Sequence, residues 1–333
     1  MAKILLKLYA VRYTLYANMR AITTLSNLDT KGCVLTIGNF DGVHIGHQEI
    51  LTTARQTADR KKTKLVVMTF DPHPLAVLCP EKAPATLTPP LFKQHLLARL
   101  GVDCLFILKS TPRLLRLSPA DFIERFIIKI IRPGVVVEGD DFNFGSGRAG
   151  SVHTLQKILA EKNIDVIIVP SKHAKLASQT VEVSSTVIRK LLIEGKVDEA
   201  AIELGRPYRL IGQVVKGRGK GTKLGFPTAN MRPPPQLVPA EGVYAGFVQI
   251  AGTEKKVCSS EEKIPAAFSI GRAQTFGDAH PRLIEAHLLI KDVGDLYGKW
   301  LAMDFITRLR PQQKFGTESQ LISQIAKDCQ KAR

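Results

Sequence analysis

Short apolar runs alternate with amphipathic stretches from residue 31 to about residue 170. The apolar runs are rich in β-branched side chains, which favours buried strands, and the stretches between them place apolar residues at helical spacing. The expected strands are 34–37, 65–70, 104–108, 135–138 and 166–169, and the expected helices are 48–61, 90–100, 119–131 and 152–162. This alternation predicts an α/β domain whose parallel sheet is doubly wound, with helices on both faces.

The pattern changes near residue 205. Two short helices are expected at 185–192 and 197–204, and Gly205-Arg206-Pro207 then interrupts the helical spacing. Beyond it, short β-like runs are separated by turns that hold Gly, Pro or Asp, which predicts a small antiparallel β-barrel. The expected strands are 208–216, 242–250, 266–270, 284–290 and 300–309, and a closing C-terminal helix is expected at 320–332.

Two domains also fit the length of 333 residues. We expect an α/β domain at 31–204 and a barrel domain at 205–333, preceded by an extension and entry segment at 1–30. The first 18 residues carry basic side chains and no acid, but they lack the apolar core and cleavage site of a secretory signal. We therefore expect the working chain to begin at Met19.

Composition narrows the choice of compartment and partner. The net charge of +17 could favour binding to nucleic acid, to an anionic membrane or to polyphosphate ligands. Lys and Arg are not gathered into one tract, so we expect a diffuse basic surface with no nucleic-acid and no membrane partner. The five cysteines include no C-x-x-C pair, which argues against a zinc site and a disulfide framework. A cytoplasmic location is therefore expected.

The first candidate catalytic residues lie where the first expected strand meets the first expected helix. Residues 38–47 read G-N-F-D-G-V-H-I-G-H. His44 and His47 flank Gly46, so both imidazoles could reach one phosphate while the glycine lets the backbone come close. The helix start adds free N–H groups and the positive end of its dipole. Stabilisation of charge on a transferring phosphate needs this kind of arrangement, which predicts nucleotidyl transfer.

Three further segments fall where ligands of a parallel sheet bind, or at a helix start. Residues 69–74 read T-F-D-P-H-P after the second strand, and residues 139–145 read G-D-D-F-N-F-G after the fourth. Residues 184–189 read S-S-T-V-I-R, where hydroxyls at a helix start and a guanidinium could hold a triphosphate. The G-x-G-x-x-G at 145–150 is not expected to bind a dinucleotide, because no acid ends the next strand.

A second phosphate-type segment opens the barrel. Residues 216–230 read K-G-R-G-K-G-T-K-L-G-F-P-T-A-N, in which glycines can turn backbone amides toward phosphates and basic side chains add charge. It is not a P-loop, since G-x-x-x-x-G-K-[ST] occurs nowhere in the chain. Thr228 and Asn230 lie two residues apart, hence on one face of an extended strand. Their oxygens are hard ligands that suit Mg²⁺.

Taken together, these motifs resemble those of the prokaryotic bifunctional riboflavin kinase/FMN adenylyltransferase (FAD synthetase) family. The N-terminal half carries G-x-F-D-G-x-H-x-G-H, T-F-x-P-H-P, D-F-x-F-G and S-S-T-x-I-R in the family's order. The C-terminal half carries P-T-A-N, G-V-Y-A-G at 242–246, E-A-H-L-L at 285–289 and D-L-Y-G at 295–298. The resemblance runs from about Lys31 to the C-terminus.

The resemblance implies two ATP-dependent reactions. The C-terminal domain would phosphorylate riboflavin to FMN, and the N-terminal domain would transfer the adenylyl group of ATP to FMN, giving FAD and pyrophosphate. His44 and His47 would stabilise the α-phosphate, and Glu285 would take the proton of the ribityl 5′-hydroxyl. The other implied residues are Gly38, Phe40, Asp41, Gly46, Ser184, Ser185, Thr186, Arg189, Gly217, Gly219, Lys223 and Gly225 for ATP and phosphate, Asp71, His73 and Asp141 for flavin, and Thr228 and Asn230 for Mg²⁺.

The chain departs from the family pattern in the barrel. The usual N-I-G-x-x-P-T-F has Ser269 for Asn and Gln274 for Pro, and Ile290-Lys291 replaces an Asp-Phe pair. We expect kinase activity to persist. Three alternatives remain: a class I aminoacyl-tRNA synthetase, which shares H-I-G-H but would need a K-M-S-K-S segment that is absent, a flavin-binding regulator without catalysis, and an adenylyltransferase without the kinase.

Overall fold

The computed structural model describes residues 19–22, 30–177, 179–217, 219–272, 282–291 and 294–333. These residues form two compact units. The first contains the described parts of Met1–Pro84 together with Lys93–Lys175 and Thr180–Val183, and the second contains Ala85–Phe92, Leu176–Gln179 and Ser184–Arg333. The predicted extension at 1–18 and the departure at Gln274 lie outside the described residues.

The first unit is built on a six-stranded sheet in which every pair of neighbours is parallel. Its order is β1 (Arg20–Ile22), β4 (Cys104–Lys109), β3 (Leu65–Asp71), β2 (Val34–Ile37), β5 (Val135–Gly139) and β8 (Asp165–Val169). From β2 the chain proceeds outward through β3 and β4 on one side, and later through β5 and β8 on the other. The strand order therefore reverses between β2 and β5, which is where sheets of this class bind ligands.

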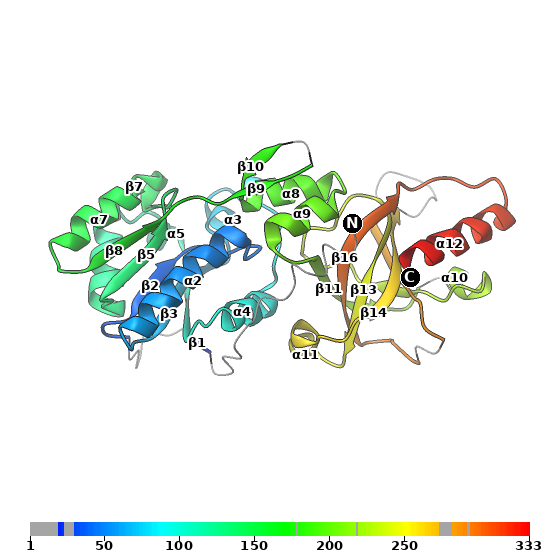
Figure 1. Ribbon diagram of the computed structural model, residues 1–333, viewed down its shortest axis with the longest axis horizontal. Coiled ribbons are helices and arrows are strands. Elements are labelled where there is room, and N and C mark those ends of the chain that lie inside the picture. The colour runs from blue at the N-terminus through cyan, green and yellow to red at the C-terminus, as the bar shows by residue number, and fades with distance from the viewer. Residues whose placement is uncertain (1–18, 23–29, 178, 218, 273–281, 292–293) are drawn as a thin grey trace. The chain divides into compact units, whose positions relative to one another are not determined.

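Helices cover both faces of this sheet, as the apolar pattern predicts. On one face, Leu35 of β2 packs in a buried cluster with Ile127 and Leu155, and on the other Val34 packs with Leu51. Figure 1 shows α2 lying along the sheet beside β2. The covering helices are α2 (Ile45–Arg60) and α4 (Pro90–Arg99) on the Val34 face, and α6 (Pro119–Phe122), the π-helix η2 (Ile123–Ile131) and α7 (Val152–Ala160) on the Leu35 face.

Short elements complete the first unit. The helices are α3 (Pro74–Leu78), η1 (Pro80–Lys82), α5 (Pro112–Leu115) and η3 (Ser146–Arg148), and the small hairpins pair β6 (Asn143–Phe144) with β7 (Gly150–Ser151) and β9 (His173–Lys175) with β10 (Thr180–Glu182).

The second unit is a closed antiparallel barrel (Figure 1). Its order is β11 (Tyr208–Val215), β12 (Ala229–Met231), β15 (Arg282–Leu288), β14 (Ile264–Arg272), β13 (Gly242–Ala251) and β16 (Trp300–Arg310), and β16 pairs with β11 to close it. The ring of Phe305 is fully buried and contacts two other fully buried rings. Its centroid lies 5.2 Å from that of Tyr244 and 5.0 Å from that of Phe268. The helices of the unit are α8 (Ser185–Ile193), α9 (Val197–Leu204), α10 (Lys220–Lys223), α11 (Glu254–Ser259) and α12 (Glu318–Ala332).

The predicted fold class is confirmed. The expected strand 34–37 and helix 197–204 have the bounds of β2 and α9, whereas the single helix expected at 119–131 is divided into α6 and the π-helix η2. The extended strand expected to carry Thr228 and Asn230 corresponds to the three-residue strand β12, which begins just after Thr228. Helices α3, α5 and α11 were missed because they are too short to show a periodic pattern, although a capping side chain precedes each of them.

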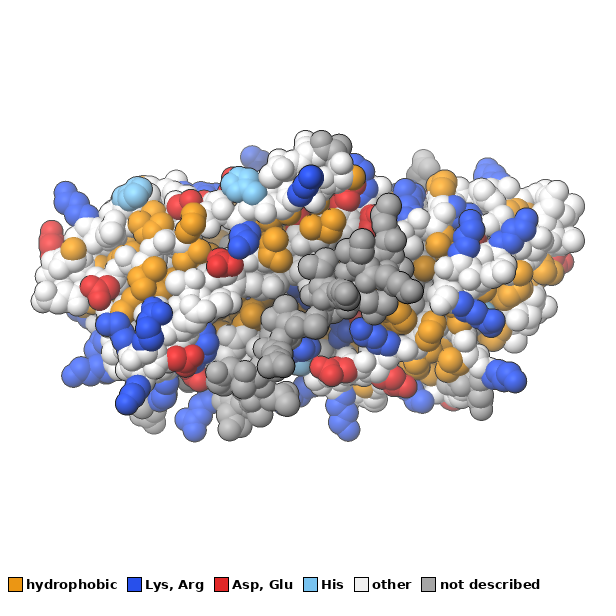
Figure 2. Space-filling view, in the orientation of Figure 1, with side chains coloured by type: hydrophobic (Ala, Val, Ile, Leu, Met, Phe, Trp, Pro, Cys, Tyr) orange, Lys and Arg blue, Asp and Glu red, His pale blue; other side chains and the backbone are white. Residues whose placement is uncertain are grey.

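One face of the molecule agrees with the diffuse charge expected from the sequence. On the face shown in Figure 2, Lys and Arg side chains are scattered among acidic and neutral ones over both units and form no single tract. Among the residues that the structure describes, no helix combines the length and the apolar character that crossing a membrane would require.

Candidate functional site

Three of the predicted motifs meet at the carboxyl edge of the first unit's sheet. The strands β3, β2 and β5 are neighbours and parallel, so the segments that follow them emerge at the same edge. This edge carries Asp71 as the last residue of β3 and His73 just beyond it, the G-N-F-D-G-V-H-I-G-H loop after β2, and Asp141 after β5. The sheet topology therefore collects these three motifs around the point where the strand order reverses.

The loop between β2 and α2 has an uncommon backbone. Phe40 and Val43 adopt positive φ angles of 47° and 43°, and Gly42 adopts 85°. A β-branched residue such as Val43 reaches this left-handed region only under constraint from its surroundings. Both Phe40 and Val43 are almost fully buried, which supplies that constraint.

The two histidines of this loop lie against each other. His44 is the N-cap of α2, and its Nδ1 accepts the backbone N–H of His47 at 3.3 Å. Because Nδ1 is the acceptor, the proton of a neutral His44 lies on Nε2, where it can be donated. The rings are stacked with centroids 3.6 Å apart, and the buried Phe40 ring lies 5.1 Å from that of His47. The loop thus presents a paired imidazole surface at a helix start.

The glycines of this motif have a packing role that the sequence analysis did not identify. A Cβ on Gly46 would lie 3.2 Å from His44 Nδ1, and one on Gly38 would lie 3.2 Å from the Phe40 ring. Gly46 was predicted to let the backbone approach a phosphate. The structure shows that it also leaves room for the His44 ring.

Sequence reasoning missed the residues that anchor the loop. The backbone carbonyl of Asn39 accepts from Lys93 Nζ at 2.7 Å and from Thr69 Oγ1 at 3.3 Å. The side-chain amide of Asn39 lies 3.2 Å from His73 Nε2, and His73 Nδ1 accepts the backbone N–H of Leu75. Lys93 lies inside an ordinary amphipathic helix pattern, so no motif in the sequence marks it.

Glu138 anchors the same loop from the other side. The pairing between β2 and β5 includes Val34 and Leu35 of β2. Beyond these pairs, the backbone N–H of Ile37 donates to Glu138 Oε1 at 2.6 Å. Burial raises the pKa of Glu138 well above its ordinary value, and the Ile37 N–H opposes that rise. A buried acid next to the ligand edge of a sheet was a signal available in the V-V-V-E-G run, where charge interrupts an apolar strand.

The S-S-T-V-I-R element lies in the second unit. Ser184 is the N-cap of α8, and its Oγ accepts the N–H of Val187 at 3.3 Å. Ser185 and Thr186 begin the helix, and Arg189 Nε donates to the carbonyl of Ala85 at 2.8 Å. The predicted capping role is therefore present at Ser184.

The second unit contains a large cavity at one side of the barrel. Its volume is about 1400 Å³. The predicted kinase residues Gly217, Gly219, Lys223, Thr228, Asn230 and Glu285 all line it. Gly225, which adopts a φ of 84°, lies in the same loop between α10 and β12.

Strand pairing brings the proposed metal ligand and the proposed base together. Asn230 of β12 lies directly opposite Glu285 of β15, and Glu285 lies opposite Ser269 of β14. Directly opposed residues point to the same face of a sheet, here the cavity wall. A Cβ on Gly217 would overlap the side-chain amide of Asn230, so any larger residue here would force that side chain to move.

Other contacts support this wall. His287 Nδ1 lies 2.7 Å from the carbonyl of Pro227, which can only accept, so His287 donates and holds the residue before Thr228. Gln312 Nε2 donates to Ser269 Oγ and to the Ile270 carbonyl, both at 3.0 Å. Gln312, which the sequence analysis did not single out, therefore supports the position where the family usually has Asn.

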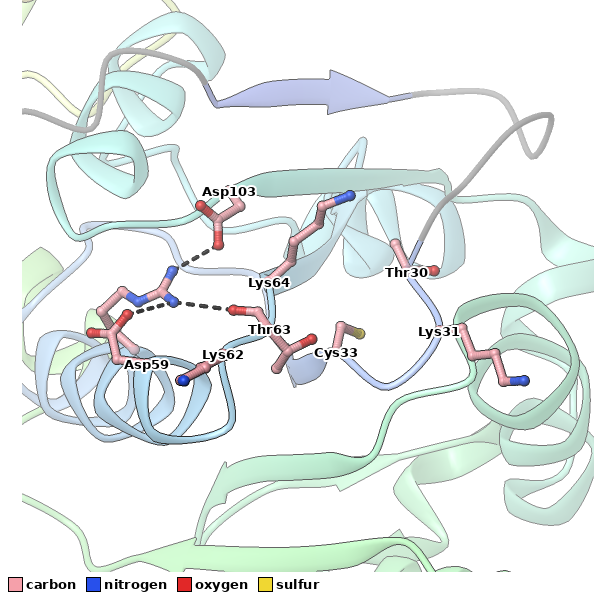
Figure 3. A pocket seen from close by; sticks show the side chains of 9 residues that line it. Thr30, Lys31, Cys33, Asp59, Lys62, Thr63, Lys64 and Asp103 are labelled. Carbon is pink, nitrogen blue, oxygen red and sulfur yellow. Dashed lines mark hydrogen bonds and ion pairs between the residues drawn. The ribbon is translucent and has the colours of Figure 1, made fainter.

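A smaller cavity of about 410 Å³ lies at the opposite, amino edge of the first unit's sheet (Figure 3). There Arg55 Nη1 binds Asp103 Oδ2 at 2.7 Å, and Arg55 Nη2 binds Asp59 at 2.8 Å. Asp103 also accepts the N–H of Leu65 at the start of β3. Ligands of such sheets bind at the carboxyl edge, so we assign these contacts to fastening α2 to the sheet.

Comparisons with known proteins identify the family. The family model for FAD synthetase matches residues 26–187, and that for riboflavin kinase matches residues 204–333. A bifunctional riboflavin kinase/FMN adenylyltransferase from Escherichia coli (strain K12) is 36% identical over 311 residues, covering 93% of this chain and 95% of the relative. The chain belongs to the bifunctional riboflavin kinase/FMN adenylyltransferase family.

Other relatives agree with this assignment. The Pseudomonas fluorescens member is 37% identical and covers 95% of this chain and 97% of its own, and the Bacillus subtilis (strain 168) member is 34% identical with coverage of 90% and 91%. A crystal structure described as a macrolide-efflux protein from Streptococcus pneumoniae matches with a TM-score of 0.81 at 29% identity, covering 95% of this chain and 98% of that one.

Proposed function

We propose that this family member makes FMN from riboflavin with its barrel domain and FAD from FMN with its N-terminal domain, using ATP in both reactions. The observation that carries the proposal is the presence of two separate sets of residues. One set comprises the stacked His44 and His47 at the ligand edge of a doubly wound sheet. The other comprises Asn230 and Glu285, opposed across two strands in the wall of the barrel cavity.

In adenylyl transfer, an FMN phosphate oxygen attacks the α-phosphorus of ATP and pyrophosphate leaves. Negative charge grows on the α-phosphate oxygens, and the imidazoles of His44 and His47 can stabilise it, together with the N–H groups at the start of α2. Ser185, Thr186 and Arg189 would hold the triphosphate, and Asp71, His73 and Asp141 would border the flavin. Ser184, Gly38, Phe40, Asp41 and Gly46 would shape these surfaces.

In riboflavin phosphorylation, Glu285 would take the proton from the ribityl 5′-hydroxyl, whose oxygen then attacks the γ-phosphorus of ATP. The loop with Gly217, Gly219, Lys223 and Gly225 would bind the phosphates through backbone amides and charge. Among the described residues no cluster of three His, Cys, Asp or Glu side chains could hold a metal. The neutral oxygens of Thr228 and Asn230 suit Mg²⁺, which would neutralise charge on the ATP phosphates.

We further propose domain limits of 31–204 and 205–333 and a cytoplasmic location. The family models, which match 26–187 and 204–333, support the division. Compactness groups residues 184–204 with the barrel, because α9 packs against β16 and β11. The location is supported by five cysteines that all remain free thiols, as a reducing compartment would keep them.

The test is a chromatographic time course of the purified chain with riboflavin, ATP and Mg²⁺. We expect FMN to accumulate before FAD. His47→Ala should slow FAD formation from added FMN about 100- to 1000-fold and spare riboflavin phosphorylation. Asn230→Asp should do the reverse, because a carboxylate opposite Glu285 adds a like charge beside the base and the phosphates.

Each variant thus serves as the control for the other. Loss of both activities by either folded variant would refute the two-site arrangement. Flavin binding without turnover of riboflavin or FMN by the wild-type chain would favour the regulator alternative instead.

A further inference from the structure

The loop that carries His44 and His47 needs anchors, because its backbone is not self-supporting. Phe40 and Val43 lie in the left-handed region, which is unfavourable for residues that carry a Cβ. Such a conformation persists only where surrounding contacts determine it. The contacts at the start of the loop converge on one backbone group, the carbonyl of Asn39.

The shorter of those contacts comes from a charged side chain. Lys93 Nζ donates to the Asn39 carbonyl at 2.7 Å across 54 positions of sequence, whereas Thr69 Oγ1 reaches the same oxygen at 3.3 Å. A hydrogen bond from an ammonium group is roughly twice as strong as a neutral one. Lys93 is therefore the principal support of the Asn39 carbonyl.

The charges around Lys93 link it to the loop itself and to the end of β3. Burial lowers the pKa of the Lys93 ammonium, and the carboxylates of Asp41 and Asp71 act in the opposite direction. Asp41 lies two residues after Asn39 in the loop, and Asp71 ends β3. One ammonium group thus binds the loop and offsets two carboxylates at an edge that must receive anionic ligands.

We propose that Lys93 is a positioning residue for adenylyl transfer, which holds the loop of His44 and His47 in its reactive geometry through the Asn39 carbonyl. The inference rests on the proposed formation of FAD by this site. Lys93 does not need to touch the substrate. Its effect passes through the backbone between Asn39 and the paired imidazoles.

The decisive variant is Lys93→Met, which keeps the length of the aliphatic chain and removes the ammonium. Displacement of a catalytic group by about 1 Å can lower a rate about 100-fold. We therefore expect kcat for FAD formation from FMN to fall by that order, with much smaller changes in KM for FMN and ATP. Riboflavin phosphorylation by the same chain should be unchanged. Lys157→Met, on an exposed lysine of α7, is the matched control and should leave both reactions unchanged.

A second variant separates the ammonium from simple packing. Lys93→Ala should regain FAD formation when a small primary amine such as ethylammonium is added, with saturation in the amine, whereas tetramethylammonium, which cannot donate a hydrogen bond, should not restore it. A residue that merely fills space would show no such difference.

The outcomes are separable. FAD formation within about threefold of wild type by a folded Lys93→Met chain would overturn the inference and leave the proposed function intact. Equal loss of the kinase, or lack of any amine rescue in Lys93→Ala, would also overturn it. A wild-type chain that forms no FAD from FMN would overturn the proposed function and the inference with it.

Discussion

Glu203 offers a quantitative test of the electrostatics of the second unit. This residue of α9 is fully buried, and neither carboxylate oxygen meets a donor at hydrogen-bond geometry among the described residues. Burial raises the pKa of Glu203 to about 7, while the backbone N–H of Ser184 opposes the rise and Glu199 adds to it. On the strands that α9 packs against, Arg209 and Asp304 pair with each other at 2.7 Å.

The sign of the effect on stability follows from the direction of this shift. A carboxyl whose pKa is higher in the folded chain than in the unfolded chain contributes stability at low pH, and that stability is lost as pH rises through the folded pKa. For Glu203 the loss begins near its ordinary value of 4.5 and is complete above about 7. At about 1.4 kcal/mol per pKa unit, ionisation of Glu203 lowers the free energy of unfolding by roughly 3 kcal/mol. Water penetration and relaxation of the surroundings reduce this loss to about 1–3 kcal/mol.

The perturbation is Glu203→Gln, which keeps the shape and removes the titration. The free energy of unfolding of the Glu203→Gln chain should be close to that of wild type at about pH 5 and higher by about 1–3 kcal/mol at about pH 8. Glu318→Gln, on an exposed residue of α12, is the control and should show no pH-dependent gain.

Urea unfolding followed by tryptophan fluorescence suits this test. The chain has a single tryptophan, Trp300, in strand β16, against which α9 packs. Its signal therefore reports the unit that contains Glu203. The reasoning would be refuted by a difference between Glu203→Gln and wild type that stays constant from about pH 5 to about pH 8.

Two further predictions concern the buried hydrogen bond of Glu138 and the close approach of Gly217 to Asn230. Glu138→Leu should lower the free energy of unfolding of the first unit by about 1–3 kcal/mol relative to Glu138→Gln, because it leaves the buried N–H of Ile37 without an acceptor; equal stability of the two variants, measured by urea unfolding followed by circular dichroism, would contradict this. Gly217→Ala should suppress riboflavin phosphorylation and spare FAD formation from FMN, because the new methyl group would overlap the side chain of Asn230. Gly252→Ala, where a methyl group meets nothing within 4 Å, is its control, and a Gly217→Ala chain with normal kinase activity would show that the approach to Asn230 is unimportant.

Much of the fold could be predicted from the sequence because it depends on short-range pattern. Val34 and Leu35 face opposite helical layers because consecutive residues of a strand point to opposite faces. The strand–loop–helix around His44 and His47 and the N-cap at Ser184 likewise depend only on residues close together in the sequence. Elements with little or no repeat, such as the four-residue helix α5, escaped prediction. A periodic signal needs several residues to rise above chance.

The support of the sites could not be predicted, because it depends on which distant segments meet. Lys93 and Glu138 lie 54 and 101 positions from the backbone groups that they hold, and nothing in their local sequence marks those partners. The opposition of Asn230 and Glu285 likewise follows from strand register, which a slip of one residue would invert. Local pattern therefore determined the elements and the reactive motifs of this protein, whereas sheet order, register and long-range hydrogen bonds decided how those motifs are held, since such contacts form only when the whole chain has packed.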